Sequence, residues 1–262
     1  MTAETPPPRR TSGIRWWAPW AARRRNGPDE PENASARDIL LAGVREYQTR
    51  TARLVRPIMA ELAMQQKPDH LFITCVDSRV VPNIITASGP GDLFIVRNVA
   101  NLVPRHGTRT PDDSVAATVE YALNVLEIKT ITVCGHSHCG GMAALLAGGD
   151  EVEHLPALSR WLKHGNRSLA AFLAEPAPEE DEQRKSFQPD SAPLARLCRT
   201  NVVQQLENLM THPDVHRRVE EGALELVGMY YELETARVYV LDGETGTFNS
   251  VPQEPFAQAV GD

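Results

Sequence analysis

Leu71-Phe72-Ile73-Thr74-Cys75-Val76-Asp77-Ser78-Arg79 joins a short apolar run to three chemically reactive side chains. The run up to Thr74 has the length of a strand and is rich in β-branched and aromatic residues. A thiol, a carboxylate and a guanidinium then follow within five positions, at Cys75, Asp77 and Arg79. We therefore expect a buried strand whose carboxyl end carries functional groups.

A second stretch, residues 131–141, is organised in the same way. It reads Ile-Thr-Val-Cys-Gly-His-Ser-His-Cys-Gly-Gly, so another β-rich run leads into His136 and Cys139. Together with Cys75 these residues offer two thiolates and one imidazole, which suit zinc and disfavour magnesium or calcium. Three protein ligands are typical of a catalytic zinc, because the fourth position stays open to water or substrate.

The elements expected around these stretches alternate between strands and helices. This order predicts an α/β fold with a mainly parallel central β-sheet flanked by helices. In such sheets ligands bind beyond the carboxyl ends of the strands, where Cys75, Asp77, Arg97 and His136 are all expected. The first three strands are expected at 71–75, 93–98 and 131–134.

The remaining elements follow from capping signals and periodicity. Thr110-Pro111-Asp112-Asp113 has the features of a helix start, with a cap hydroxyl, proline at N1 and acidic side chains. The apolar positions within 161–173 fit one amphipathic helix, and residues 200–210 fit another. Two further strands are expected at 224–231 and 237–241.

The first 34 residues differ in composition from the rest. They are rich in proline, arginine and tryptophan and are predicted to be a disordered tail, before a catalytic domain at 35–255. The tail's tryptophans could pack on the domain, or touch a membrane surface or a partner. Residues 35–66 are predicted to form an N-terminal helical arm capped by Ser35. Pro57 indicates either two helices or one kinked helix.

Composition limits the function classes. The 262 residues carry a formal charge of −7, which argues against a nucleic-acid partner because an acidic surface does not attract phosphate. No apolar run reaches the roughly 18 residues that a transmembrane helix needs. Four cysteines, two of them at metal-like spacing, fit a reducing compartment, so a cytoplasmic location is expected.

Three motifs together resemble the β-class carbonic anhydrases: Cys-Val-Asp-Ser-Arg at 75–79, Pro-Gly-Asp-Leu-Phe-Ile-Val-Arg-Asn at 90–98 and Gly-His-Ser-His-Cys-Gly-Gly at 135–141. The chain is also similar to anhydrase domains fused to sulfate-type transporters. The resemblance implies that Cys75, His136 and Cys139 bind one Zn²⁺ per subunit. It further implies that zinc-bound hydroxide converts carbon dioxide to bicarbonate and a proton, in a homodimer or tetramer.

The resemblance also gives Asp77 and Arg79 roles. A zinc site with two thiolates and a neutral imidazole has no net charge, so a nearby proton acceptor gains importance. Asp77 is expected to be that acceptor, with Arg79 pairing it and fixing its orientation. Asp77 is also a conditional fourth zinc ligand in a closed state. The two residues could instead be only a structural ion pair.

Other polar residues near the motifs have open roles. His138 could compete as a ligand or carry protons, or be a neighbouring polar group. Cys134 and Cys198 are expected to be packing or surface thiols. Arg97 could shape the cleft or hold a loop, as could the adjacent Asn98.

One difference from some family members concerns a second, inhibitory bicarbonate site. Those members place a tryptophan three residues before the first cysteine ligand, where this chain has Phe72. The second bicarbonate site is therefore not expected here.

Two other functions compete with carbon dioxide hydration. A zinc hydroxide could act on carbon disulfide or carbonyl sulfide in a cleft of different shape. The domain could also bind bicarbonate or a partner without catalysis around a structural zinc. The presence of Asp77 and Arg79 argues against the second alternative, because a structural site needs neither.

Overall fold

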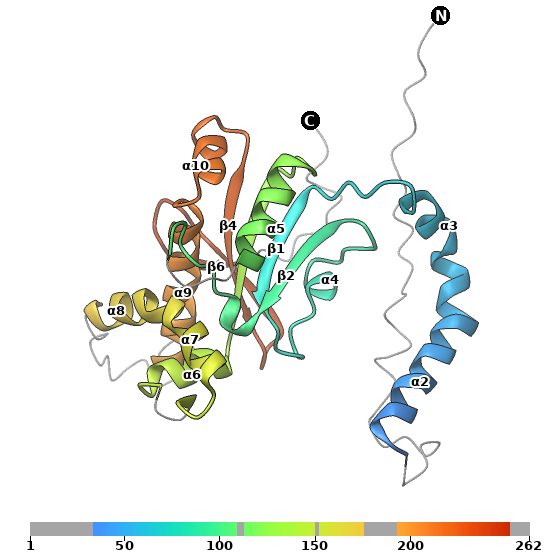
Figure 1. Ribbon diagram of the computed structural model, residues 1–262, viewed down its shortest axis with the longest axis horizontal. Coiled ribbons are helices and arrows are strands. Elements are labelled where there is room, and N and C mark those ends of the chain that lie inside the picture. The colour runs from blue at the N-terminus through green and yellow to red at the C-terminus, as the bar shows by residue number, and fades with distance from the viewer. Residues whose placement is uncertain (1–33, 109–112, 150–151, 176–192, 252–262) are drawn as a thin grey trace, which may run out of the picture. The chain divides into compact units, whose positions relative to one another are not determined.

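The computed structural model describes residues 34–108, 113–149, 152–175 and 193–251 (Figure 1). The chain divides into two compact units, residues 1–65 and 66–262. Most of the predicted tail, the first three residues of the helix start at Thr110 and residues 176–192 lie outside the described residues.

The described part of the first unit is helical. Ser35 caps it through a reciprocal box with Asp38, as the sequence predicted. Pro57 lies inside α3 and does not end it, so of the two predicted alternatives the one with two helices separated at this proline is wrong. The irregularity lies earlier, in a π-helical turn where the Ala52 amide donates to the Tyr47 carbonyl. The elements are α2 (Ala36–Glu46), the π turn (Tyr47–Thr51) and α3 (Ala52–Leu62).

The second unit is built on a six-stranded sheet in the order β2-β1-β3-β4-β5-β6. The first four strands in this order are parallel, and β5 and β6 are antiparallel to their neighbours, so the predicted mainly parallel sheet is confirmed. The strands are β1 (His70–Cys75), β2 (Leu93–Asn98), β3 (Thr130–His136), β4 (Glu225–Glu232), β5 (Arg237–Leu241) and β6 (Phe248–Ser250).

Helices pack against the buried centre of this sheet. Leu71 and Ile73 of β1 share one face with Ile131 and Val133 of β3, because side chains on a strand alternate between faces. This face packs with apolar side chains of α5 and α9 in the main core. The helices of this unit are α4 (Pro82–Ile85), α5 (Asp113–Asn124), α6 (Gly140–Leu146), α7 (Pro156–Leu162), α8 (Asn166–Ala174), α9 (Pro193–Leu209) and α10 (Pro213–Glu220).

The segment expected to form one helix within 161–173 is two helices. A 3-10 turn, Lys163–Gly165, separates α7 from α8. Gly165 in this turn packs closely against α6, since a Cβ there would lie 2.9 Å from Leu145 Cδ2. The apolar periodicity could not show the break, because the turn keeps nearly helical spacing. Helix α9 likewise begins before residue 200, so Cys198 lies within a helix rather than before one.

The strand order creates a topological switch point. From β1 the chain reaches β2 on one side and then crosses to β3 on the other side of β1. Thr74 pairs with Cys134, so the carboxyl ends of β1 and β3 lie side by side. Ligands in open α/β sheets bind at such a point. The fold therefore brings Cys75 and His136 to adjacent strand ends.

We expect Gly135→Ala to destabilise the fold next to this switch point. A Cβ at Gly135 would lie 2.7 Å from Val202 Cγ2 and 3.2 Å from the Cys198 carbonyl oxygen of α9. Overpacking of this kind costs about 1–3 kcal/mol in the free energy of unfolding. Urea unfolding measures the change, with Gly140→Ala as the control because a Cβ there has nothing within 4 Å. Equal unfolding midpoints for the two variants would contradict this account.

Candidate metal centre

Three potential ligand atoms meet beyond the ends of β1 and β3. Cys75 is the last residue of β1, His136 is the last residue of β3, and Cys139 directly precedes α6. One sulfur or ring nitrogen from each residue lies within 4.8 Å of the other two, and all three residues are buried. The structure thus brings together the three residues that the sequence singled out as metal ligands.

The imidazole of His136 is oriented for this role. Its Nδ1 lies 2.8 Å from the Ser137 carbonyl oxygen, and a carbonyl can only accept, so Nδ1 carries the proton. Nε2 then holds a lone pair. This atom is fully buried and has no hydrogen-bond partner among the described residues. A buried acceptor without a partner, facing two sulfurs, fits a metal ligand.

The two thiols influence each other strongly. Contact with the Cys139 thiol lowers the pKa of Cys75 to about 4, aided by hydrogen bonds from the backbone amides of Asp77 and Ala100. The same contact, together with burial, raises the pKa of Cys139. The pair thus offers one ready thiolate and a second sulfur that can become one. Two soft sulfurs beside an imidazole nitrogen form a donor set that fits zinc.

Asp77 and Arg79 form a tight ion pair next to these ligands. Arg79 Nε lies 2.9 Å from Asp77 Oδ1 and Nη2 lies 2.7 Å from Oδ2, and the Arg79 backbone amide also donates to Oδ1 at 2.9 Å. These hydrogen bonds hold the pKa of Asp77 well below its usual range. Asp77 Oδ2 is also 4.0 Å from His136 Nε2, so the carboxylate borders the ligand group.

Comparisons with known proteins agree with this geometry. A family model described as carbonic anhydrase matches residues 70–238. A carbonic anhydrase of Pseudomonas aeruginosa is 42% identical over 204 residues, which make up 78% of this chain and 87% of that protein. The solved structure of the β-carbonic anhydrase CcaA superposes with a TM-score of 0.73 and 35% identity, covering 83% of this chain and 100% of that one. The chain belongs to the β-class carbonic anhydrases.

A second solved structure has a related description. It comes from a study of two tetrameric β-carbonic anhydrases of the filamentous ascomycete Sordaria macrospora. The TM-score is 0.63 at 28% identity, with coverage of 78% of this chain and 95% of that one. Within the described residues, this carbonic anhydrase has no helix that is long and apolar enough to cross a membrane.

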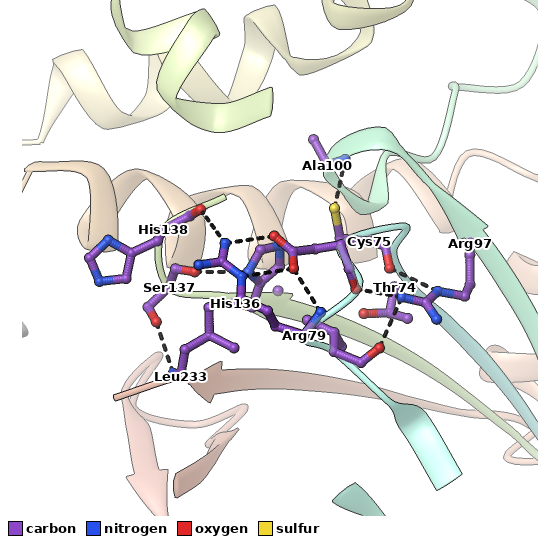
Figure 2. A network of polar contacts seen from close by, with 12 residues as sticks. Thr74, Cys75, Arg79, Arg97, Ala100, His136, Ser137, His138 and Leu233 are labelled. Atoms are coloured by element: carbon purple, nitrogen blue, oxygen red, sulfur yellow. Dashed lines mark hydrogen bonds and ion pairs between the residues drawn. The ribbon is translucent and has the colours of Figure 1, made fainter. Parts of the chain in front are cut away.

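Arg97 and Asn98 hold the backbone around the ligand group in this carbonic anhydrase. Arg97 donates to the carbonyls of Cys75, Asp77 and Val80, at 3.0, 2.7 and 2.9 Å. These bonds from Arg97 brace the turn that carries the first thiol and the Asp77–Arg79 pair. The contacts of Arg97 are visible in Figure 2. Asn98 closes the next loop through two hydrogen bonds to the backbone of one residue. The sequence left open whether these residues shape the cleft or hold a loop. Their hydrogen bonds support the second role.

His138 lies at the rim of the site. Its ring points away from Cys75 (Figure 2), and its Nε2 pairs with a carboxylate oxygen of Glu234. Glu234 also accepts a hydrogen bond from the Ser137 hydroxyl at 3.0 Å. His138 lies between His136 and Cys139 in the sequence, but its ring lies outside the ligand group. Sequence reasoning missed Glu234, because it lies about a hundred residues away and in a plain turn.

The other two cysteines lie outside the ligand group. Cys134 and Cys198 are both buried, and burial raises the pKa of each to about 12. At neutral pH both therefore remain protonated thiols. This state fits the packing role that the sequence predicted for them.

Proposed function

We propose that this chain catalyses the reversible hydration of carbon dioxide to bicarbonate and a proton, with one Zn²⁺ held by Cys75, His136 and Cys139. The observation that carries the proposal is the convergence of two thiols and an unpartnered imidazole nitrogen at the switch point. Zinc in such a site supplies a water acidified enough to form hydroxide near neutral pH, which is the nucleophile that carbon dioxide requires.

Asp77 is placed to accept a hydrogen bond from that nucleophile. Its Oδ2 borders the ligand group, and the low pKa keeps the carboxylate ionised, so it can only accept. An acceptor at this point holds the remaining proton of the attacking oxygen and directs a lone pair toward the substrate carbon. Arg79 serves by fixing both carboxylate oxygens in place through its planar fork.

The same carboxylate could close the site by binding the metal itself. Both Asp77 oxygens accept hydrogen bonds from Arg79, which supports an open arrangement in which a water position remains free. Arg79 Nη2 is also 3.2 Å from the His138 carbonyl oxygen, so the guanidinium bridges the two ligand stretches. We propose that this bridge sets the balance between the open state and a closed, Asp77-bound state.

The catalytic domain is proposed to span 35–255, including the helical arm. A chain with two metal-binding thiols must keep them reduced, which supports a cytoplasmic site of action. The negative charge supports a small-molecule substrate rather than a nucleic acid. The proposed reaction makes carbon dioxide or bicarbonate the small molecule that binds at this site.

Assembly into a homodimer or tetramer is also part of the proposal. Helices α2 and α3 have no buried residue, although several large apolar side chains lie along them. Such a surface on a small helical unit favours association with a second copy. The tetrameric anhydrases from Sordaria macrospora give this proposal a precedent. The exposed apolar residues are Ile39, Leu40, Leu41, Val44, Tyr47, Leu54, Ile58 and Met59.

We expect light scattering of the full chain to give the mass of two or four copies at micromolar concentration. Leu40→Glu combined with Leu54→Glu should reduce that mass, because a charge in an apolar interface is costly to bury. Met64→Glu is the matched control, since Met64 is 90% exposed and lies beyond α3. A monomeric full chain would contradict the proposed assembly.

The proposed reaction is tested by a substrate panel. Stopped-flow rates on carbon dioxide are compared with hydrolysis rates on carbonyl sulfide and carbon disulfide, with zinc quantified on each sample. We expect rapid hydration of carbon dioxide and turnover of the sulfur substrates that is slower by several orders of magnitude. Preference for a sulfur substrate would overturn the choice of substrate, and zinc-loaded protein without any turnover would favour a binding module.

A further inference from the structure

A strained turn follows β2 and lies against the first thiol. Its backbone is left-handed at two consecutive residues, Ala100 with φ 68° and Asn101 with φ 47°. Residues other than glycine seldom adopt such angles, and two in succession need support from their surroundings. Both residues are buried. The turn also lies against the start of α6, since a Cβ at Gly141 would be 2.9 Å from the Ala100 Cβ.

The turn uses its strain to aim one amide. The Ala100 N–H donates to Cys75 Sγ across 3.4 Å (Figure 2). The carbonyl on the other side of that same peptide unit, Val99 O, accepts from Trp161 Nε1 of α7 at 2.8 Å. The next carbonyl, Ala100 O, accepts from Asn201 Nδ2 of α9 at 3.1 Å. Two side chains from two helices therefore fix the peptide units on both sides of Ala100.

A row of buried amides on α9 supports this arrangement. Asn201, Gln205 and Asn208 lie at i, i+4 and i+7, so they share one face of the helix. Gln205 Nε2 donates to Asn201 Oδ1 at 2.9 Å, and Asn208 Nδ2 donates to Gln205 Oε1 at 3.0 Å. The C-terminal end of the row holds Val103, whose amide donates to Gln205 and whose carbonyl accepts from Asn208. Buried amides are costly unless satisfied. The side-chain nitrogens of Asn201, Gln205 and Asn208 all donate, while Asn208 Oδ1 has no partner among the described residues. The linked bonds fix the geometry of the turn that the row binds.

We propose that Asn201 and Trp161 are positioning residues, which hold the left-handed turn so that the Ala100 amide tunes the Cys75 thiolate. A hydrogen bond to sulfur draws electron density away from the thiolate and lowers its donation to a bound cation. A metal held at this site would then draw more charge from the ligand in its open position. This inference rests on the proposed metal site. It adds one residue from α7 and one from α9 to those that influence the proposed ligand Cys75.

Cobalt substitution tests the proposal by spectroscopy. Cobalt(II) bound to thiolates gives a sulfur-to-metal charge-transfer band, whose energy falls when the thiolate becomes a stronger donor. We expect Asn201→Leu to move this band to longer wavelength, because the turn relaxes and the Ala100 amide leaves the sulfur. Trp161→Phe should move it in the same direction. This variant keeps an aromatic ring and most of the packing, so it remains informative if Asn201→Leu does not fold.

Asn208→Leu is the matched control. Asn208 lies on the same buried face, makes bonds to the same row and also donates to a turn carbonyl, but that carbonyl belongs to Val103, away from the sulfur. We expect Asn208→Leu to lower stability and leave the band at its wild-type wavelength. An equal shift in all three variants, or no shift in Asn201→Leu and Trp161→Phe, would overturn the positioning role. A wild-type cobalt protein without any thiolate band would instead contradict the proposed ligand set.

Discussion

Arg79→Ala is expected to keep its zinc and lose most of its carbon dioxide hydration. The substitution removes two side-chain hydrogen bonds that hold the Asp77 carboxylate and leaves only the donation from the backbone amide of residue 79. A freed carboxylate two residues from a proposed ligand can reach the metal and occupy the position that water needs. We expect kcat/KM to fall by about 10- to 100-fold, as for other residues that orient metal-site groups. Stopped-flow kinetics with elemental analysis on the same sample measure both quantities.

Two companion variants separate charge from geometry at this position. Arg79→Lys keeps the positive charge and loses the planar fork, so its activity should fall between those of wild type and Arg79→Ala. Asp77→Asn should also lose activity, because an amide is a weaker acceptor, but it should leave the water position on the metal free. Full activity of Arg79→Ala with an unchanged pH profile would show that Arg79 is only structural.

The pH dependence follows from the same pair. The rate should fall with falling pH, because protonation removes the hydroxide on which it depends. Arg79 depresses the pKa of Asp77, so the carboxylate stays ionised throughout this fall in the wild type. In Arg79→Ala that pKa should rise toward its ordinary value of about 4, which adds a second loss at the acidic end of the profile. A pH–rate profile of both proteins would show the added step.

The stability contribution of this pair has the matching sign. The pKa of Asp77 is lower in the folded state than in the unfolded state, so the pair stabilises the fold at pH values above the ordinary pKa of an aspartate. This contribution is lost as the pH falls through the folded-state pKa. The Arg79 side chain is about half exposed to solvent, at 53%. Solvent screening therefore keeps the contribution small. The pair should matter more for the rate than for folding.

Loss of either thiol at the candidate centre is expected to abolish metal binding and activity together. Cys75→Ala or Cys139→Ala leaves one sulfur and one imidazole, which is too few protein ligands for a typical zinc site. We expect both variants to contain almost no zinc and to hydrate carbon dioxide no faster than the uncatalysed reaction. Elemental analysis and stopped-flow kinetics give the two readouts.

The chain provides matched controls for this experiment in its other two buried thiols. Cys134→Ala and Cys198→Ala remove the same atoms from the core, yet both should retain zinc, because neither thiol belongs to the ligand group. Circular dichroism checks that all four variants are folded. Full zinc retention by both Cys75→Ala and Cys139→Ala would refute the ligand assignment.

The sequence could predict that Cys75 and His136 lie close together, because each of them ends a short strand. Cys75 and His136 directly end runs of β-rich residues, and the parallel topology alone is enough to place two such ends together. The bidentate pair was also predictable, since Asp77 and Arg79 are only two residues apart. At these positions the local sequence pattern and the parallel strand order were enough to predict which side chains lie close together.

The features that the sequence could not predict depend on contacts between distant elements. The break between α7 and α8 lies where Gly165 meets α6, and the pairing of His138 with Glu234 joins the turn after β3 to a turn after β4. The polar face of α9 reads as an ordinary helix surface, although Asn201 and Gln205 are fully buried against the turn after β2. Periodicity reports which residues share a face, but not what that face contacts.

A zinc titration of metal-free protein tests the central claim most directly. Stopped-flow hydration of carbon dioxide is measured at each addition, with bound zinc quantified on the same samples. The account predicts that activity and bound zinc rise together and level off at about one zinc per chain. Activity that is already complete without zinc, or saturation with zinc that brings no hydration, would contradict it.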